Sequence, residues 1–377
     1  MPKPSDIPVC PVAPPARALN RVISDYQISL ITPLFGGGVE AGAPDETLPI
    51  RGISIRGQLQ FWWRATLGAA FATRKDLFDR HAEVWGKTER RSPVEIEIRN
   101  VDVKIPLRRC AKYDDGPRPR WETPFDGPQN PLPYALFPFQ GTAAKGAAQF
   151  IEAASFTLRV RYPQTLLQDV EAAVRAWVSF GGLGSRTRRG CGALMCRELA
   201  PQGFDDIQRW YRACPLPGPA FVRDWPTMPH AMLVGDKPED SIEAWKKVIG
   251  LLKEFRQGEG VGRTRGRQPN RPGRSRYPEP ETIRFVTGKR PQQHPRLANI
   301  PEDAFPRAEF GLPIIFHFQG QGEPADTELY RRRLLSDLRS SKVSTVCTWI
   351  GEYRSTKLWT TCPLIWTTYA PFLSRIL

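Results

Sequence analysis

Between residues 21 and 200, segments with the alternation of β-strands and segments with the periodicity of α-helices follow one another in a defined order. The strand-like segments are residues 26–34, 94–103, 156–162 and 193–199, and the helical segments are 54–70 and 166–180. The order strand, helix, strand, strand, helix, strand predicts a ferredoxin-like βαββαβ domain of the α+β class, the topology of RNA recognition modules. Two helices would cover one face of its antiparallel sheet and leave the other face free for a ligand. Residues 108–149 are rich in Pro and Gly and predict a long irregular insertion.

The 377 residues are enough for two domains, and we expect them to be tandem ferredoxin-like units. Residues 1–20 contain six prolines and predict a disordered lead. Residues 21–200 would form the first domain. Residues 201–377 would form a second, degraded copy, with a helix at 241–257 and a basic loop at 256–296 that holds eleven Lys or Arg against three Glu.

Net charge suggests the kind of partner. Lysine and arginine number 54 against 39 for aspartate and glutamate, a formal net charge of +15. Such an excess repels itself unless a polyanion shares the surface, so nucleic acid is the first partner to consider. A merely soluble basic protein would have the same charge, so composition alone leaves both possibilities open.

Seven scattered cysteines and four histidines argue against disulfides and metal sites. The closest cysteine pair, Cys191 and Cys196, has no second pair and no nearby histidine, so we expect no metal and no other cofactor. Free thiols indicate a reducing cytoplasm. The chain lacks an apolar run of about 18 residues, so we expect a cytoplasmic protein without a membrane partner.

The loop GGLGSRTRRGCG, residues 181–192, joins the second predicted helix to the last predicted strand. Its candidate RNA-binding residues are Gly182, Gly184, Arg186, Arg188, Arg189, Gly190 and Gly192. Glycines can take positive φ and present N–H groups to phosphate, while arginines add charge and bidentate donors. The loop lacks the Gly-Lys-Ser/Thr ending of a phosphate-binding Walker loop and the G-x-G-x-x-G spacing of dinucleotide sites. The alternative is a simple turn in which Gly181 or Gly182 ends the helix.

A second candidate segment is IRGISIRGQLQFWWR, residues 50–64, in which Arg51, Arg56 and Arg64 are expected at or near the start of the first helix. A helix N-terminus carries unpaired N–H groups and a partial positive charge, so flanking arginines would complete an anion site. At least one of Trp62 and Trp63 is expected in the core, and base stacking by either is the alternative.

Catalytic residues are harder to find. No Ser/His/Asp or Cys/His set is evident, and Asp114 with Asp115, between Tyr and Gly, fits a turn better than an active site. His81 is the best general-base candidate if the protein cleaves RNA. We therefore expect a protein that is not an enzyme.

The run ITPLFGGG, followed by PIRGISIRGQLQFWWR and GGLGSRTRRGCGAL, resembles the RAMP superfamily of CRISPR proteins, and within it subunits of type III-B effectors. The resemblance covers about residues 26–200, with a weaker similarity at 310–318. It implies tandem ferredoxin-like domains, contact with guide RNA and target single-stranded RNA near the 3′ end of the guide, and other RAMP subunits as partners. In such effectors other subunits cleave the target, so the resemblance implies a non-catalytic role in antiviral defence.

The chain after about Leu335 departs from the family pattern, because Ser, Thr, Cys and Trp replace the expected closing strand. We expect this tail to be divergent or to derive from a shifted reading frame. Two alternatives to the RNA-binding subunit remain: a RAMP-family endonuclease that processes guide precursors, and a protein scaffold without RNA contact.

Overall fold

The computed structural model describes residues 21–39, 43–104, 107–112, 120–121, 124–141, 146–200, 206, 209–210, 225, 227, 240–258, 277–291, 314–316, 318, 321–325 and 327–329. The predicted lead at 1–20, most of the basic loop at 256–296 and the tail after Leu335 lie outside these residues, as do Asp114 and Asp115. The described residues divide into two compact units.

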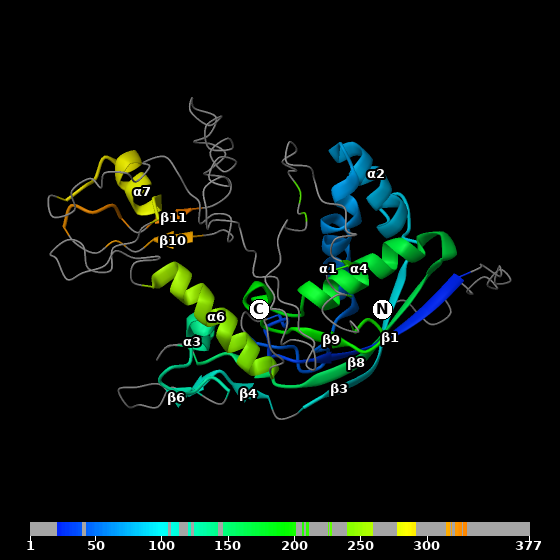
Figure 1. The fold of residues 1–377 in the computed structure, drawn as a ribbon, viewed down its shortest axis with the longest axis horizontal. Coiled ribbons are helices and arrows are strands. Elements are labelled where there is room, and N and C mark those ends of the chain that lie inside the picture. The colour runs from blue at the N-terminus through cyan, green and yellow to red at the C-terminus, as the bar shows by residue number, and fades with distance from the viewer. Residues whose placement is uncertain are drawn as a thin grey trace, which may run out of the picture. The chain divides into compact units, whose positions relative to one another are not determined.

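The first unit is built on a four-stranded antiparallel sheet (Figure 1). Its strands are β1 (Arg21–Leu30), β3 (Glu95–Val103), β8 (Ala154–Pro163) and β9 (Leu194–Cys196). Their spatial order is β3-β8-β1-β9, and each neighbouring pair is antiparallel. The first and third strands of the βαββαβ order thus lie in the centre, as in a ferredoxin-like domain. The predicted α+β class and the ferredoxin-like topology of this unit are confirmed.

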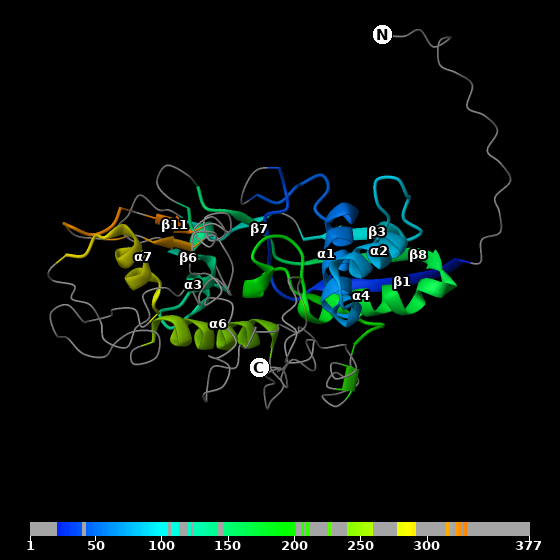
Figure 2. The ribbon, with the colours of Figure 1, turned by 90° about the horizontal axis from the view of Figure 1, so that it is seen from above.

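Helices α1 (Gly52–Ala65) and α4 (Leu167–Phe180) cover one face of the sheet (Figures 1 and 2). Short 3-10 turns, η2 (Leu67–Ala70) and η4 (Gln164–Leu166), follow α1 and precede α4. Alternate strand residues, such as Tyr26, Ile28 and Leu158, point into the core beneath the helices. The apolar face of α4 contributes Val174 and Trp177 to the same core.

A third helix, α2 (Arg74–Trp85), was not predicted from periodicity. The Thr73 hydroxyl accepts the Asp76 main-chain N–H at 3.1 Å and so caps its first turn. This Thr-x-x-Asp spacing is the sequence signal that would have identified the helix.

The insertion after β3 contains more order than its composition indicated. Strands β2 (Leu34–Phe35), β7 (Gln149–Ile151) and β4 (Arg108–Arg109) form a small sheet, and β5 (Ala111–Lys112) pairs with β6 (Arg120–Trp121). Phe35, Phe125 and Phe150 are fully buried, and the Phe35 ring stacks on Phe139 of the turn η3 (Phe137–Phe139) with 4.6 Å between centroids. The prediction of a wholly irregular insertion is therefore wrong, because aromatic burial stabilises strands too short for periodicity to reveal.

The second unit contains α3 (Leu132–Leu136), most of α6 (Ser241–Gln257), α7 (Glu279–Thr287) and the antiparallel pair β10 (Ile314–Phe316) and β11 (Thr327–Leu329). The helix predicted at 241–257 is present as α6. Helix α7 lies within the segment predicted as a basic loop. Buried Arg284 donates to both carboxylate oxygens of Glu323 at 2.7 and 2.8 Å, which fixes α7 to the segment before β11.

Candidate nucleic-acid interface

The glycine loop packs against itself and against the turn after β1. Gly181 ends α4, its N–H donating to the Trp177 carbonyl at 2.8 Å. The N–H of Leu183 donates to Gly192, and the N–H of Gly192 donates to Pro33, at 2.9 and 2.8 Å. Main-chain hydrogen bonds thus fix the loop in one conformation.

The loop glycines allow this close packing. Gly192 has φ +65°, and a β-carbon built there would lie 1.9 Å from the Leu183 carbonyl oxygen. Gly184 has φ +79°, and a β-carbon built there would lie 2.5 Å from the carbonyl oxygen of Phe35. A β-carbon on Gly182 would lie 2.7 Å from the Gly192 carbonyl oxygen, and Gly190 has φ +77°. Contacts within the protein therefore account for glycines that the sequence had associated with a ligand.

The three loop arginines differ in exposure. Arg186 takes the left-handed conformation at φ 59°, and Arg188 and Arg189 lie in the 3-10 turn η5 (Thr187–Arg189). Arg186 and Arg189 are half-buried near Cys191, whose thiol pKa is raised to about 12 by burial despite their positive charges. Arg188 is exposed and forms no ion pair with any residue that the structure describes. Its guanidinium is the loop group best placed to meet a phosphate.

Thr32 is a loop partner that the sequence analysis did not identify. Its buried hydroxyl donates to the Gly190 carbonyl at 2.5 Å and accepts the Ala193 N–H at 2.9 Å. The hydroxyl thus joins the end of β1 to the end of the glycine loop. Strand alternation carries no signal for such a contact, because it reports the face of a residue and not its distant partner.

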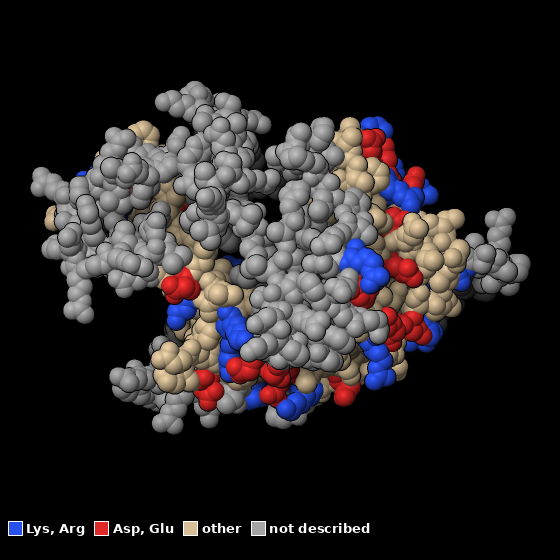
Figure 3. Space-filling model, viewed as in Figure 1, with Lys and Arg blue, Asp and Glu red and all other residues tan. Residues whose placement is uncertain are grey.

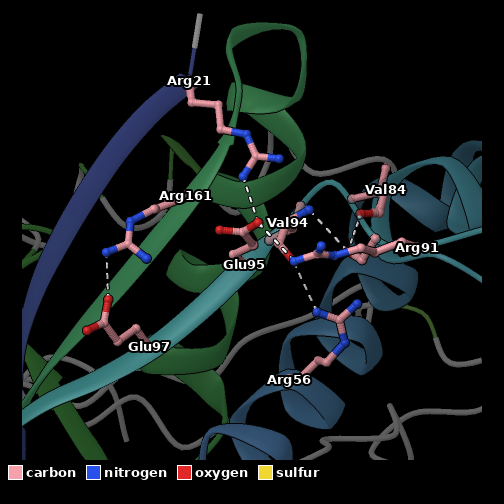
Figure 4. Close-up of polar contacts among 9 residues, drawn as sticks. Arg21, Arg56, Val84, Arg91, Val94, Glu95, Glu97 and Arg161 are labelled. Atoms are coloured by element: carbon pink, nitrogen blue, oxygen red, sulfur yellow. Dashed lines mark hydrogen bonds and ion pairs between the residues drawn. The ribbon is translucent and has the colours of Figure 1, made fainter. Parts of the chain in front are cut away.

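The arginines of α1 do not gather at its N-terminus. Arg51 is the N-cap, but Arg64 lies in the last turn, roughly 20 Å away at 1.5 Å per residue. Arg56 donates to the main-chain carbonyl of Val94 at 3.2 Å (Figure 4) and to that of Trp85 at 2.5 Å, and burial lowers its pKa. The expectation that all three lie at or near the helix start is therefore wrong for Arg64. At 3.6 residues per turn, Arg64 lies more than three turns from the cap in any helix that contains both residues.

Arg64 contacts the histidine that was considered as a general base. Its Nη1 lies 3.2 Å from Nε2 of His81. The pKa of His81 is lowered to about 4, first by burial and then by the charges of Arg64 and Arg56. The imidazole is therefore neutral at pH 7, and its Nε2 accepts a hydrogen bond from Arg64.

His81 makes a testable contribution to the pH dependence of stability. The unfolded chain binds a proton at His81 near pH 6.5, whereas the folded protein resists protonation until about pH 4. The folded state should therefore lose stability as pH falls from 6.5 to 4, by at most about 3 kcal/mol. We expect His81→Gln, which keeps an acceptor for Arg64, to flatten this loss in urea unfolding between pH 6.5 and 5. An unchanged pH profile would contradict the assignment.

The two tryptophans of α1 have different environments. Trp63 is 1% exposed, and its indole N–H donates to Asp169 at 2.8 Å. The expectation that at least one lies in the core is confirmed. Trp62 is half-buried against Phe180, with 6.1 Å between ring centroids, and its Nε1 faces Gly181 so closely that a β-carbon there would lie 2.6 Å away. Trp62 thus joins the last turn of α1 to the start of the glycine loop.

The uncovered face of the sheet carries paired charges (Figure 4). The ion pairs are Asp25–Arg159, Glu97–Arg161 and Glu95–Arg21, at 2.5, 2.7 and 2.8 Å. RNA recognition modules stack bases on aromatic residues of this face, but β1, β3 and β8 direct no aromatic side chain to it. On the surface shown in Figure 3, positive and negative residues are likewise interspersed where residues are described. Among the described strand residues, the uncovered face thus offers no aromatic platform, and its arginines Arg21, Arg159 and Arg161 already pair with carboxylates.

The described residues were also searched for metal sites and for helices that could span a membrane. They contain no group of three or more His, Cys, Asp or Glu side chains that could hold a metal ion. Within the same part of the chain, every helix is too short or too polar to cross a membrane. The described cysteines, Cys110, Cys191 and Cys196, are buried, and they form no disulfide with one another.

Comparisons with known proteins show what the chain is similar to. No curated protein matches the chain. Among solved structures, it is similar to Cmr1 from Pyrococcus furiosus in its apo form, with 18% identity over 66% of this chain and 80% of that one and a TM-score of 0.42. Similarity also extends to a chain of the type III-B Cmr-beta complex bound to cognate target RNA, with 16% identity over 47% of this chain and 55% of that one and a TM-score of 0.30. The model of the RAMP superfamily matches residues 27–195, so the resemblance to that superfamily is confirmed for the segment that extends from β1 into β9.

Proposed function

We propose that this chain is a non-catalytic RNA-binding subunit of a type III-B CRISPR effector ribonucleoprotein, the subunit called RAMP-module protein one. The observation that carries the proposal is Arg188, an exposed guanidinium without an ion-pair partner among the described residues, on the loop at the end of the RAMP-matching segment. Its chemistry fits bidentate phosphate binding. Such contacts hold RNA in position with little base reading.

The partners follow from the same proposal. Guide RNA and target single-stranded RNA near the guide 3′ end would be the ligands, and other RAMP subunits would be the protein neighbours. The match to the RAMP superfamily over residues 27–195 supports this assignment. The protein would act in the cytoplasm in antiviral defence.

The candidate RNA-binding residues are proposed with different roles. Arg188 would contact phosphate directly, with Arg186 and Arg189 beside it and Arg51 at the start of α1. Gly182, Gly184, Gly190 and Gly192 would hold the loop backbone in the conformation that presents these arginines. Arg56 and Arg64 would act indirectly, through carbonyls and His81.

The environment of His81 supports a role without catalysis. A pKa of about 4 makes the imidazole a weak base, and the Arg64 guanidinium already donates to its Nε2. A general base for RNA cleavage would need that nitrogen free to take a proton from the substrate.

Arg188→Ala tests the proposed phosphate contact. We expect weaker binding of labelled single-stranded RNA of any sequence, and a plot of log affinity against log salt whose slope is shallower by about 0.7. Arg90→Ala is the matched control, because Arg90 is also exposed but lies in the turn after α2. An Arg188→Ala slope equal to that of the wild type would remove the loop as a phosphate site.

The same assay in EDTA separates the rival functions. A salt-sensitive shift of intact RNA agrees with the proposed subunit, whereas cleaved RNA would indicate a RAMP-family endonuclease that processes guide precursors. No shift at low salt would indicate a scaffold that meets protein partners only.

A further inference from the structure

The outer face of α1 carries an apolar stripe that no described part of the protein covers. Ile53, Gly57 and Phe61 are spaced four residues apart and therefore lie on one side of the helix. Ile53 is 79% exposed and Phe61 is 37% exposed. A β-carbon built on Gly57 would meet no atom within 4 Å. The stripe is thus a shallow notch, one residue wide, between two apolar side chains.

Folding of the described residues does not explain Gly57. Glycine inside a helix lowers helix stability relative to alanine, because the unfolded chain loses more conformational freedom. Gly68, by contrast, has a packing reason, since a β-carbon there would lie 2.9 Å from Leu77 Cδ1. Gly57 also has a helical φ, so it needs no left-handed conformation. The absence of a side chain at Gly57 leaves space on the helix surface for another molecule.

Charge indicates the kind of molecule that fits. The fourteen residues of α1 include no Asp or Glu, and Arg51 occupies the N-cap position, where its side chain forms no capping hydrogen bond. A polyanion therefore meets no repulsion from α1 itself. Arg56 and Arg64 already donate to groups of the protein, and the exposed side chains of α1, those of Ile53, Ser54 and Phe61, are uncharged.

The stripe ends beside the glycine loop. The Phe61 ring meets Trp62 edge to face, with 5.2 Å between centroids and an 86° angle, and Trp62 in turn faces Gly181. This contact fixes the orientation of an exposed aromatic ring next to the loop that carries Arg188. Single-stranded RNA offers both phosphates for such an arginine and base faces for such a ring.

We propose that Ile53, Gly57 and Phe61 form an RNA subsite that takes a ribose and base by apolar contact, while the glycine loop holds phosphate. The subsite rests on the proposed function, since it presumes that RNA is the ligand. Gly57 would allow the nucleotide to approach the bare helix, and Phe61 would stack on the base. The two contacts differ in salt dependence, because only phosphate contacts release counterions.

Gly57→Ala should have opposite effects on stability and on binding. We expect its melting temperature to rise by about 2 °C, because alanine favours the helix. Its affinity for single-stranded RNA should fall, because the new methyl group occupies the notch. Gly250→Ala in α6 is the matched control, since Gly250 is also inside a helix and a β-carbon there meets only an ordinary contact at 3.9 Å. The control should gain similar stability and keep its RNA affinity.

Phe61→Ala should weaken RNA binding roughly tenfold by loss of one stacked base, with the salt slope unchanged. Phe78→Ala, which removes an exposed ring from α2, is its control and should bind as the wild type does. A fluorescent 2-aminopurine base in the RNA should be quenched by the wild type and less by Phe61→Ala.

The outcomes separate this subsite from the function on which it rests. If the wild type binds RNA and both α1 variants bind equally well, the subsite is overturned and the proposed function stands. If the variants keep RNA binding but fail to join other effector subunits, the stripe is a protein contact and the subsite is equally overturned. If the wild type itself binds no RNA, the proposed function fails and the subsite fails with it.

Discussion

Replacing Gly192 by alanine is expected to destabilise the first unit by about 3 kcal/mol or more and to abolish RNA binding by the glycine loop. The left-handed φ of +65° alone costs a residue with a β-carbon about 1 kcal/mol. The larger part comes from the Leu183 carbonyl oxygen, 1.9 Å from the new β-carbon, because the chain must separate there. Separation breaks the hydrogen bonds of Gly192 with Leu183 and Pro33.

Gly37→Ala is the matched control for this effect. Gly37 has φ +100°, but a β-carbon there would meet no atom within 4 Å, so its replacement carries backbone strain without a clash. Urea unfolding should show a much larger loss for Gly192→Ala than for Gly37→Ala. Equal losses in the two variants would mean that the loop does not pack as described.

Asp169→Ala should lower the free energy of unfolding by about 3 kcal/mol. Asp169 is 6% exposed and lies in the first turn of α4, where its oxygens accept the indole N–H of Trp63 at 2.8 Å and Nη2 of Arg80 at 2.6 Å. Removal of the carboxylate leaves a buried indole N–H without an acceptor. Arg80 loses less, because its side chain is partly exposed and still pairs with Glu83 at 2.8 Å.

Two further variants test this account of Asp169. Asp169→Asn keeps an acceptor for Trp63 and should lose about half as much stability. Asp25→Ala also removes a carboxylate with two short contacts, both to Arg159, but this carboxylate lies on the exposed face of the sheet. The variant should lower the free energy of unfolding by about 1 kcal/mol or less. A loss for Asp25→Ala as large as that for Asp169→Ala would show that burial is not the deciding factor.

The topology of the first unit could be predicted because three of its four sheet strands and both covering helices are long enough to show their period. Ten residues of β8 alternate, and fourteen residues of α4 repeat with an apolar face. The strands of the insertion, such as β2 at Leu34–Phe35, are too short for any period. These strands are stabilised by ring packing between residues more than a hundred positions apart, such as Phe35 and Phe150. The alternation of apolar and polar residues within a short segment carries no information about such contacts.

The sequence was enough to predict which residues belong to the candidate site, but not the role of each residue in it. The sequence located the loop and its three arginines, but exposure separates Arg188 from Arg186 and Arg189. It placed Arg64 with Arg51, whereas the helical rise between positions 51 and 64 puts them at opposite ends of α1. The type of a residue shows which groups it can bind. Which group it does bind depends on tertiary structure, as for Arg56, whose guanidinium donates to the main-chain carbonyl of Val94.

Phe35 contacts two segments that are far apart along the chain. Its carbonyl accepts the Ser185 N–H of the glycine loop at 2.7 Å, while its ring stacks on Phe139 of the turn η3. The glycine loop and the insertion therefore cannot be redesigned separately. A new loop must preserve the hydrogen bond to Phe35, and the position of Phe35 depends on the aromatic rings of the insertion. An engineer who grafts this loop onto another ferredoxin-like scaffold would need to transfer β2 and its aromatic neighbours together with it.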